Sequence, residues 1–114
     1  MNTLVKGQVI MVELTSTEAN VQRGMRPCVV VQNNIGNKFS PTLIVAPLTS
    51  RTKRDMVTHA KLYPTLENGL TVASTALLEQ IQTISKDSVK RVLGVLNEME
   101  MKLINKAIVA SLAL

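Results

Sequence analysis

The stretch "RPCVVVQNNIGNKFSPTLIVAPLTS", residues 26–50, places two apolar, β-branched runs on either side of a polar segment. The first run predicts a strand opened by Pro27, because the missing N–H of proline does least harm at a strand end. Residues 33–41, rich in Asn, Gly, Ser and Pro, predict a turn. Residues 42–50 predict another strand, in which Pro47 indicates a sheet edge or a bulge near the end. The stretch therefore predicts a fold built mainly from strands.

Further strands are predicted on both sides of this stretch. Residues 8–14 mix β-branched and apolar side chains, as a first strand does, and residues 15–25 form a polar loop long enough to serve a function. Residues 56–62 predict a shorter fourth strand. Residues 70–85 predict two strands with a bend, although their Ala and Leu content also allows a helix.

The end of the chain changes to helical periodicity. Ser85 or Asp87 is placed to cap a short helix that runs through Arg91. Asn97 followed by Glu100 resembles a capping box. A terminal amphipathic helix is predicted by residues at helical spacing, namely Met101, Ile104, Ala107, Ile108 and Ser111 or Leu112. Short strands before a helical tail predict a mainly β fold with C-terminal helices, in which the sheet forms a small barrel.

Length and composition limit the class of protein. The 114 residues match one domain, so 1–114 is taken as a single domain. No run of about 18 uncharged apolar residues occurs, which argues against a membrane span. The N-terminal stretch alternates like a strand and does not resemble a signal peptide. With Cys28 as the one cysteine, no internal disulfide is possible, and a reducing cytoplasm is predicted.

The charge of the chain points to a polyanionic partner. Lys and Arg total 13 against 8 Asp and Glu, which gives a net charge of +5 and a pI near 9.7. Such a surplus on a small domain attracts nucleic acid, an acidic peptide or a membrane surface. Phe39 and Tyr63 are the only aromatic residues, which disfavours a surface that binds bases mainly by stacking.

Metal, cofactor and thiol chemistry are not indicated by the sequence. A metal site needs several His, Cys, Asp or Glu residues together, whereas the single His and the single Cys lie in different segments. No glycine-rich phosphate loop is present, and no cofactor is predicted. Cys28 lies within an apolar strand, which favours a buried inert thiol over a nucleophile. His59 is best explained as a half-buried strand residue.

Arg26 and Thr49 each have a structural and a functional interpretation. Arg26 precedes Pro27, which restricts the backbone and orients the guanidinium. It is either a surface arginine beside a strand or a clamp for a phosphate. The planar guanidinium is suited to the second role, because it binds two phosphate oxygens at once. Thr49 ends its strand before a basic loop. Its hydroxyl either caps the turn or binds a phosphate. When Thr49 is considered by itself, the turn-capping interpretation is favoured.

Basic side chains flank these two residues along the chain. Arg51, Lys53 and Arg54 are either a solvated face or, together with Arg23 and Arg26, the lining of one positive groove. The groove requires the loop before Pro27 and the loop after Thr49 to lie at the same end of the sheet. The sequence leaves both interpretations open.

Several segments together resemble the MazF/PemK family of toxins. They are the opening stretch, "KGQVIMVEL" (6–14), "THAKL" (58–62), "ALLEQIQTISK" (76–86) and "SLAL" (111–114), in the family's order over nearly the whole chain. The resemblance implies an SH3-like small barrel of the MazF/PemK/CcdB type that acts as a homodimer in the bacterial cytoplasm. It also implies a toxin that inhibits growth by metal-independent, sequence-specific cleavage of single-stranded messenger RNA and needs no cofactor.

The resemblance also implies roles for particular residues. Arg26 and Thr49 become catalytic in an attack by the ribose 2′-hydroxyl that leaves a 2′,3′-cyclic phosphate and a 5′-hydroxyl. RNA binding is implied for polar residues of the two loops and the sheet, namely Asn20, Gln22, Arg23, Ser50, Arg51, Lys53, Arg54, His59, Glu79 and Gln80. Many relatives carry Ser-Glu-Gln-small-Gly before the Arg-Pro pair, whereas this chain has Val21 for the Glu and Arg23 for the small residue.

Two other functions fit the same features. A non-catalytic basic module of this fold that binds RNA or an antitoxin explains the net charge equally well. A relative that only binds its antitoxin is compatible with the missing carboxylate at Val21. The protein partner is predicted to be an antitoxin with an acidic, largely disordered segment, which folds along the basic groove and competes with RNA.

Overall fold

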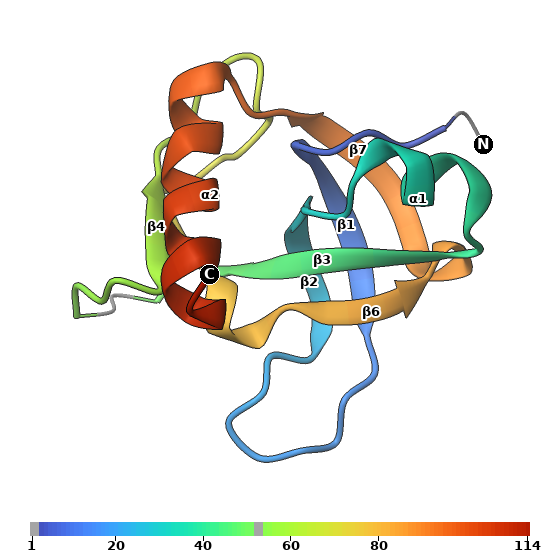
Figure 1. Cartoon of the computed structure of the whole chain (residues 1–114), viewed down its shortest axis with the longest axis horizontal. Helices are drawn as coiled ribbons and strands as arrows, with labels where there is room; N and C mark the ends of the chain where they lie inside the picture. Colours follow the sequence, from blue (N-terminus) through green and yellow to red (C-terminus); the bar gives the residue numbers. More distant parts are fainter. Residues whose placement is uncertain (1–2, 52–53) are drawn as a thin grey trace.

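In the computed structural model, which describes residues 3–51 and 54–114, seven strands form one strongly curved sheet (Figure 1). Neighbouring strands follow the order β4-β5-β3-β2-β1-β7, and β6 pairs with β3 beside this path. The strands are β1 (Gln8–Leu14), β2 (Gly24–Val30), β3 (Thr42–Thr49), β4 (His59–Leu62), β5 (Ser74–Leu77), β6 (Gln82–Ser85) and β7 (Val89–Val95). In the described part of the chain, β4 and β7 stand at the two ends of this path and do not pair with each other, so the barrel stays open between them.

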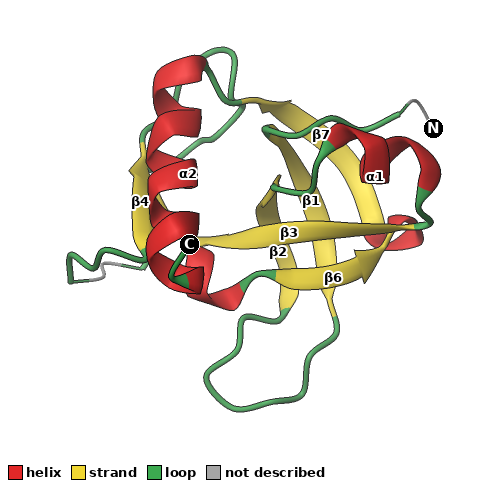
Figure 2. Ribbon diagram, in the orientation of Figure 1, coloured by secondary structure: helices red, strands yellow, loops and turns green. Residues whose placement is uncertain are grey.

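The central strands bury apolar side chains on both faces. One face packs against the helix α2 (Glu98–Leu112) and is called the α2 face; Figure 2 shows this helix along the side of the sheet. Its cluster includes Val29, Ala46, Leu48, Ala60, Leu62 and Ala76, with Ile104 and Ala107 from the helix. The opposite face, called the far face, buries Ile10, Val12, Cys28, Val30, Leu43 and Val45. Successive residues of a strand point to opposite faces of the sheet. Strand residues that alternate with those of the α2-face cluster therefore point to the far face, also near the ends of the strands.

The helix α2 begins with the predicted capping box. The Asn97 side chain accepts a hydrogen bond from the Glu100 N–H at 2.8 Å, and Glu100 Oε1 accepts one from the Asn97 N–H at 2.9 Å. Glu100 Oε2 also accepts a bond from Asn68 Nδ2, which ties the helix to the connection between β4 and β5. The predicted terminal helix is thus confirmed. No helix within the described residues has the length and apolar character needed to span a bilayer.

The polar segment at residues 33–41 contains a helix, α1 (Asn34–Phe39), where the sequence predicted a turn. The Asn33 side chain caps it by accepting a hydrogen bond from the Gly36 N–H at 2.8 Å. Asn37 is fully buried and donates to the Gln32 carbonyl at 2.9 Å. Residue types that favour turns also cap and anchor short helices, which is why composition alone gave the wrong element here.

The strand β7 stands where the sequence predicted a short helix through Arg91. Ser85 does cap a helix, since its Oγ accepts a hydrogen bond from the Asp87 N–H at 3.2 Å, but this helix is only the 3-10 turn η2 (Lys86–Ser88). From Val89 the chain pairs with β1 in an antiparallel arrangement. Valine favours strands over helices, so pairing with β1 outweighs the local cap.

The remaining strand predictions are largely confirmed. β2 begins at Gly24, whose φ of +81° suits glycine, so Pro27 lies inside the strand and does not open it. The two strands predicted for residues 70–85 are β5 and β6, joined by the 3-10 turn η1 (Leu78–Gln80), and the helical alternative is wrong. β4 covers only the second half of the predicted fourth strand. Pro47 lies where β3 passes from its pairing with β6 to its pairing with β5.

Candidate functional site

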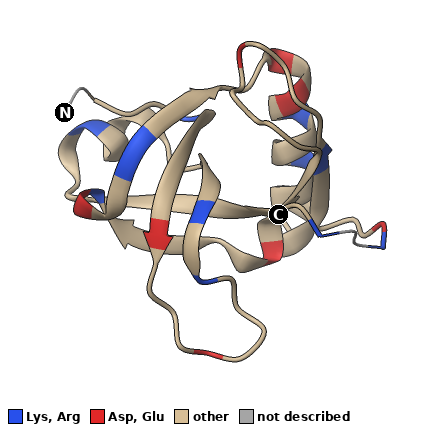
Figure 3. Ribbon diagram, turned by 180° about the vertical axis from the view of Figure 1, so that it is seen from behind, with Lys and Arg blue, Asp and Glu red and all other residues tan. Residues whose placement is uncertain are grey.

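A polar groove lies where the loop between β1 and β2 meets β2, the end of β3 and η1. It has a volume of about 470 Å³ and is lined by Asn20, Val21, Gln22, Arg23, Arg26, Arg51 and Gln80. All of these except Val21 are predicted site residues. The lining holds arginines and no carboxylate, and no ion pair involves these arginines among residues 3–51 and 54–114. Figure 3 shows basic positions in the loop and at the start of β2. The groove is therefore suited to a polyanion.

The groove loop is held in place by a side chain from η1. Gln80 Oε1 accepts a hydrogen bond from the Gln22 N–H at 2.9 Å, and Gln80 Nε2 donates to the Asn20 carbonyl at 3.1 Å. The amide of Gln80, predicted to bind RNA, is thus engaged with the protein on both sides. Gln22 Oε1 is buried and has no hydrogen-bond partner in the described part of the chain, so it becomes an acceptor for a ligand only when its side chain turns outward.

Arg26 is oriented by the loop that precedes it. Its Nε donates to the Arg23 carbonyl at 3.0 Å, and the residue is partly buried at the start of β2. This bond uses one of the five N–H groups of the guanidinium and leaves the terminal amino groups for a ligand. The predicted oriented and partly shielded arginine is therefore present.

The pairing of β2 with β3 ends two residues before Arg26 and Thr49, and its register relates the two residues. Cys28 of β2 pairs with Pro47 of β3, and continuing this antiparallel register by two residues sets Arg26 opposite Thr49. Thr49 in turn pairs with Thr75 of β5, which pairs with Lys61 of β4. Residues opposite one another point to the same side of a sheet, with Cβ atoms about 4.5–5.5 Å apart. A row of Arg26, Thr49, Thr75 and Lys61 therefore crosses the far face.

Thr49 is buried at the end of β3, with only 2% of its surface exposed. Its Oγ1 accepts a hydrogen bond from the Arg51 N–H at 3.2 Å, which confirms the turn-capping role that its position predicted. A hydroxyl that accepts one bond still has a proton to donate. Thr49 is thus fixed by the turn and keeps one proton to donate, but it is not among the residues that line the groove.

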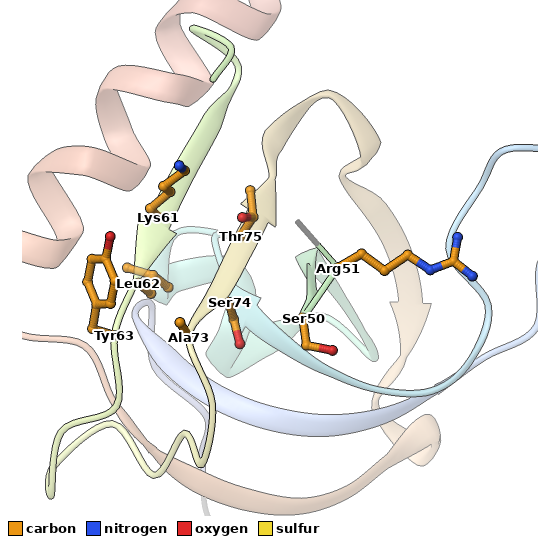
Figure 4. A pocket seen from close by; sticks show the side chains of 8 residues that line it. All are labelled: Ser50, Arg51, Lys61, Leu62, Tyr63, Ala73, Ser74 and Thr75. Carbon is orange, nitrogen blue, oxygen red and sulfur yellow. The ribbon is translucent and has the colours of Figure 1, made fainter. Parts of the chain in front are cut away.

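A second cavity, of about 170 Å³, adjoins the row on its β4 side (Figure 4). It is lined by Ser50, Arg51, Lys61, Leu62, Tyr63, Ala73, Ser74 and Thr75. Arg51 belongs to both hollows, and Figure 4 shows its side chain reaching away from Tyr63. The sequence prediction missed Lys61, Tyr63 and Thr75. Alternation along β4, continued one residue past its end, puts His59, Lys61 and Tyr63 on one face and is the signal that contained Lys61 and Tyr63. Thr75 lies on β5 and carries no such signal.

The remaining predicted residues lie beyond this cavity or outside the described ranges. His59 Nε2 and Glu79 Oε2 are 2.9 Å apart, and the His59 side chain is only 6% exposed, as predicted for a strand residue. Arg54 and His59 line a further hollow of about 210 Å³ that also includes Lys61 and Thr75. A hydrogen bond from Lys61 to Asp55 raises the pKa of the lysine and lowers that of the carboxyl. Lys53 lies outside the described residues.

Cys28 is the buried thiol that the sequence predicted. It lies in the far-face cluster, and burial raises its pKa from 9.0 to about 12, although the nearby Arg26 acts in the opposite direction. A thiol with this pKa carries almost no thiolate at neutral pH and is a poor nucleophile. No cluster of three metal-binding side chains occurs among the residues that the structure describes.

Known proteins resemble this chain over nearly its full length. A family model described as PemK-like, MazF-like toxin of type II toxin-antitoxin system matches residues 5–112. A Staphylococcus saprophyticus protein named Endoribonuclease MazF is 40% identical over 110 residues, which cover 96% of this chain and 91% of that protein.

Solved structures agree with this match. A mycobacterial endoribonuclease in complex with its cognate antitoxin is 26% identical, with a TM-score of 0.80 over 97% of this chain and 96% of that one. MazF from Deinococcus radiodurans is 17% identical and has a TM-score of 0.83 over 100% of both chains. The fold expected from the sequence, a small barrel-like sheet with a C-terminal helix, is thereby confirmed.

Proposed function

The chain belongs to the PemK-like, MazF-like toxins of type II toxin–antitoxin systems, and on this premise we propose that it is an endoribonuclease that cuts single-stranded RNA. The proposed reaction is metal-independent and sequence-specific, with messenger RNA as the main substrate in the bacterial cytoplasm. The observation that supports the proposal is the arginine-lined groove that holds Arg26, together with the β2–β3 register, which sets Thr49 opposite Arg26 when it is extended by two residues beyond the Cys28–Pro47 pair.

RNA carries its own nucleophile, so the protein has to supply position and charge. In the proposed step the 2′-hydroxyl passes its proton to water and its oxygen forms a bond to phosphorus, while the bond from phosphorus to the 5′-oxygen breaks. The 5′-oxygen takes up a proton from water, so the proton count balances. The products are a 2′,3′-cyclic phosphate and a 5′-hydroxyl end. The added negative charge spreads over the phosphate oxygens in the transition state, where fixed donors contribute most.

Arg26 and Thr49 are placed to supply those donors. The terminal amino groups of Arg26 neutralise two phosphate oxygens, because the guanidinium fork matches their spacing. With a pKa above about 12, this group acts through its charge and hydrogen bonds rather than by giving up a proton. The Thr49 hydroxyl, held by the Arg51 N–H, donates to a phosphate oxygen and fixes its orientation.

Sequence selection is assigned to polar groups around the groove. Gln22 Oε1 has no partner among the described residues and accepts from a base edge once its side chain turns outward. Asn20 and the exposed Ser50 supply further donors and acceptors at the two sides. Gln80 contributes by holding Asn20 and Gln22 in position.

The groove is also the proposed antitoxin site. A mycobacterial relative of this fold was solved in complex with its cognate antitoxin, which supports a protein partner here. Guanidinium groups without acidic partners among the described residues favour an acidic segment that lies along the groove. Such a segment excludes RNA because it neutralises the same charges.

A homodimer is proposed on the side where β4 meets α2. A mostly apolar hollow of about 650 Å³ lies there, lined in part by Met56, Val57, Leu103 and Val109. These four side chains are exposed in the single chain. Exposed apolar surface of this kind is typical of protein interfaces. The expected light-scattering mass is twice 12.4 kDa, and a mass of one chain would contradict the dimer.

The central experiment incubates the purified protein with a long RNA in EDTA. Cleavage is expected for the wild type, and Arg26→Ala is expected to lower its rate by about 10²- to 10³-fold, as removal of one transition-state donor does. Arg91→Ala is the matched control, because Arg91 is an exposed arginine of β7, outside the groove. A single 2′-deoxy sugar at the cut site is expected to block cutting there.

The outcomes separate the proposed function from its alternative. Intact RNA with the wild type, or equal cutting by wild type and Arg26→Ala, contradicts the proposed mechanism. RNA that binds with a steep salt dependence and is never cut identifies a non-catalytic binding module instead.

A further inference from the structure

The cavity beside the row owes its shape to one small side chain between two large ones. Leu62 pairs with Ser74, so one step further along that register sets Tyr63 opposite Ala73. Thr49 pairs with Thr75, and two steps beyond this pair, past the ends of β3 and β5, set Arg51 opposite Ala73 on its other side. Ala73 offers only a methyl group in the middle, and all three residues line the cavity. The hollow is therefore a slot with a tyrosine ring on one side and an arginine stem on the other (Figure 4).

The chemistry of the slot suits a flat group with polar edges. Tyr63 is 63% exposed in the single chain, and it lines both this slot and the hollow proposed for the dimer. A planar group that stacks on its ring therefore lies at the edge of the proposed dimer interface. Ser50 and Thr75 add hydroxyls, which both donate and accept, and Ser74 Oγ donates to the Val72 carbonyl and keeps lone pairs to accept with. The volume of about 170 Å³ is well below the ~300–1,000 Å³ of pockets for drug-sized ligands. A single ring system fits this size.

The position of the slot selects among flat ligands. Thr75 belongs to the slot and lies directly opposite Thr49, so the slot starts one residue pair away from the proposed scissile phosphate. Arg51 connects the slot to the groove, and Lys61 stands at its other side. Arg51, which forms no ion pair among the described residues, supplies positive charge for the backbone on the groove side, whereas Lys61 pairs with Asp55. A nucleobase of the bound RNA has this combination of flat face, polar edge and flanking charge.

We propose that this slot binds the base of the nucleotide adjacent to the cut, stacked on Tyr63. The proposal rests on the proposed endoribonuclease function and adds a recognition site on β4 and β5 outside the two loops. One stacking contact is compatible with a chain that has a single tyrosine and a single phenylalanine. It assigns Tyr63 a positioning role, because the ring holds the base and touches no reacting atom.

The test uses the fluorescence of the protein itself. The chain has one tyrosine and no tryptophan, so tyrosine emission reports on Tyr63 alone. A short single-stranded RNA with a 2′-O-methyl group at the cut site binds without being cut. Stacking is expected to quench the emission, and an abasic nucleotide next to the cut is expected to restore it. Abasic nucleotides elsewhere in the RNA leave the quenching in place, and polyglutamate at equal charge does not quench.

Cleavage of the unmodified RNA gives the second readout. Tyr63→Ala is expected to lower kcat/KM by about 5- to 150-fold, the range that loss of one base–aromatic stack produces. Tyr63→Phe is expected to stay near wild type, and Phe39→Ala, which truncates the exposed phenylalanine of α1, is the matched control. With the abasic substrate, Tyr63→Ala should cause no further loss, because the partner of the ring is already gone.

The outcomes distinguish this proposal from the function on which it rests. RNA that is cut while tyrosine emission stays unchanged overturns the slot and leaves the endoribonuclease intact. Quenching that is relieved by the abasic position without any cutting supports the slot and overturns catalysis. Quenching by polyglutamate equal to that by RNA shows that the slot takes acidic protein segments and also overturns the proposal.

Discussion

Gln80 Oε1 accepts a hydrogen bond from the backbone N–H of Gln22 at 2.9 Å, which joins η1 to the groove loop across 58 residues of sequence. The same side chain donates to the Asn20 carbonyl, so one amide satisfies two backbone groups of a loop that has little apolar anchoring. The shape of the groove therefore depends on a residue that does not need to touch RNA itself.

Replacing Gln80 is expected to loosen the loop more than the fold. Gln80→Ala removes two hydrogen bonds, which costs about 1–3 kcal/mol in total and lowers cleavage activity about tenfold through a less ordered groove. Hydrogen exchange is expected to show faster exchange at the Gln22 amide. Gln82→Ala is the control, because Gln82 makes only a long bond of 3.4 Å to the same loop. Equal exchange rates in both variants would contradict this role of Gln80.

The arginines of the groove predict a definite salt dependence of RNA binding. Each phosphate contact to a single strand contributes about −0.7 to the slope of log K against log salt. Three contacts, from Arg23, Arg26 and Arg51, give a slope near −2 by this rule. Arg23→Gln is expected to reduce the slope by about 0.7, measured with uncut 2′-O-methyl RNA. Lys90→Gln on β7, outside the groove, should leave it unchanged; a slope unaffected by Arg23→Gln would remove Arg23 from the site.

The fold was predictable where the sequence pattern was compatible with only one type of secondary structure. β-branched runs define β1 and β3 almost to the residue, and the pair Asn97 and Glu100 defines the start of α2. Prediction failed where a local signal competed with a distant partner. Asn33 is equally suited to a turn and to a helix cap, and the segment after Ser85 becomes a strand because β1 lies beside it.

The site was predictable only where residues are close in sequence or carry a distinctive pair. Arg26 next to Pro27 and Thr49 before a basic loop are local signals, and the β2–β3 register, extended by two residues beyond Cys28 and Pro47, sets them opposite each other. Lys61, Tyr63 and Thr75 carry no local signal of this kind. Lys61 and Thr75 join the row, and Tyr63 the adjoining cavity, only because β4, β5 and β3 pair in one register, which depends on the whole sheet.

The Cys28 thiol predicts a loss of stability at high pH. Its pKa rises from 9.0 to about 12 on folding, so the folded protein keeps a proton that the unfolded chain loses. The free energy of unfolding should therefore be unaffected below about pH 8 and fall from about pH 9 toward 12, by up to about 1.4 kcal/mol per pH unit. Urea unfolding of Cys28→Ala, which lacks the thiol, should show a shallower fall. Identical profiles for both proteins would contradict the assignment.

Two substitutions of Thr49 separate the structural contribution of its hydroxyl from the proposed catalytic contribution. Thr49→Ser keeps the hydroxyl and is expected to retain most of the cleavage rate. Thr49→Val keeps the shape and loses both the acceptor for the Arg51 N–H and the donor to phosphate. It is expected to lower kcat by about 10²- to 10³-fold with little change in the affinity for uncut RNA, because the donor acts mainly in the transition state.

Stability measurements decide whether that loss comes from the fold. The Arg51 N–H is in an exposed residue and can turn to water, so Thr49→Val should cost only about 1 kcal/mol of unfolding free energy. A small shift in the melting temperature together with a large fall in kcat assigns the hydroxyl to the reaction. A Thr49→Val protein that melts normally and cuts RNA at the wild-type rate would limit Thr49 to capping the turn and leave Arg26 without the partner proposed for it.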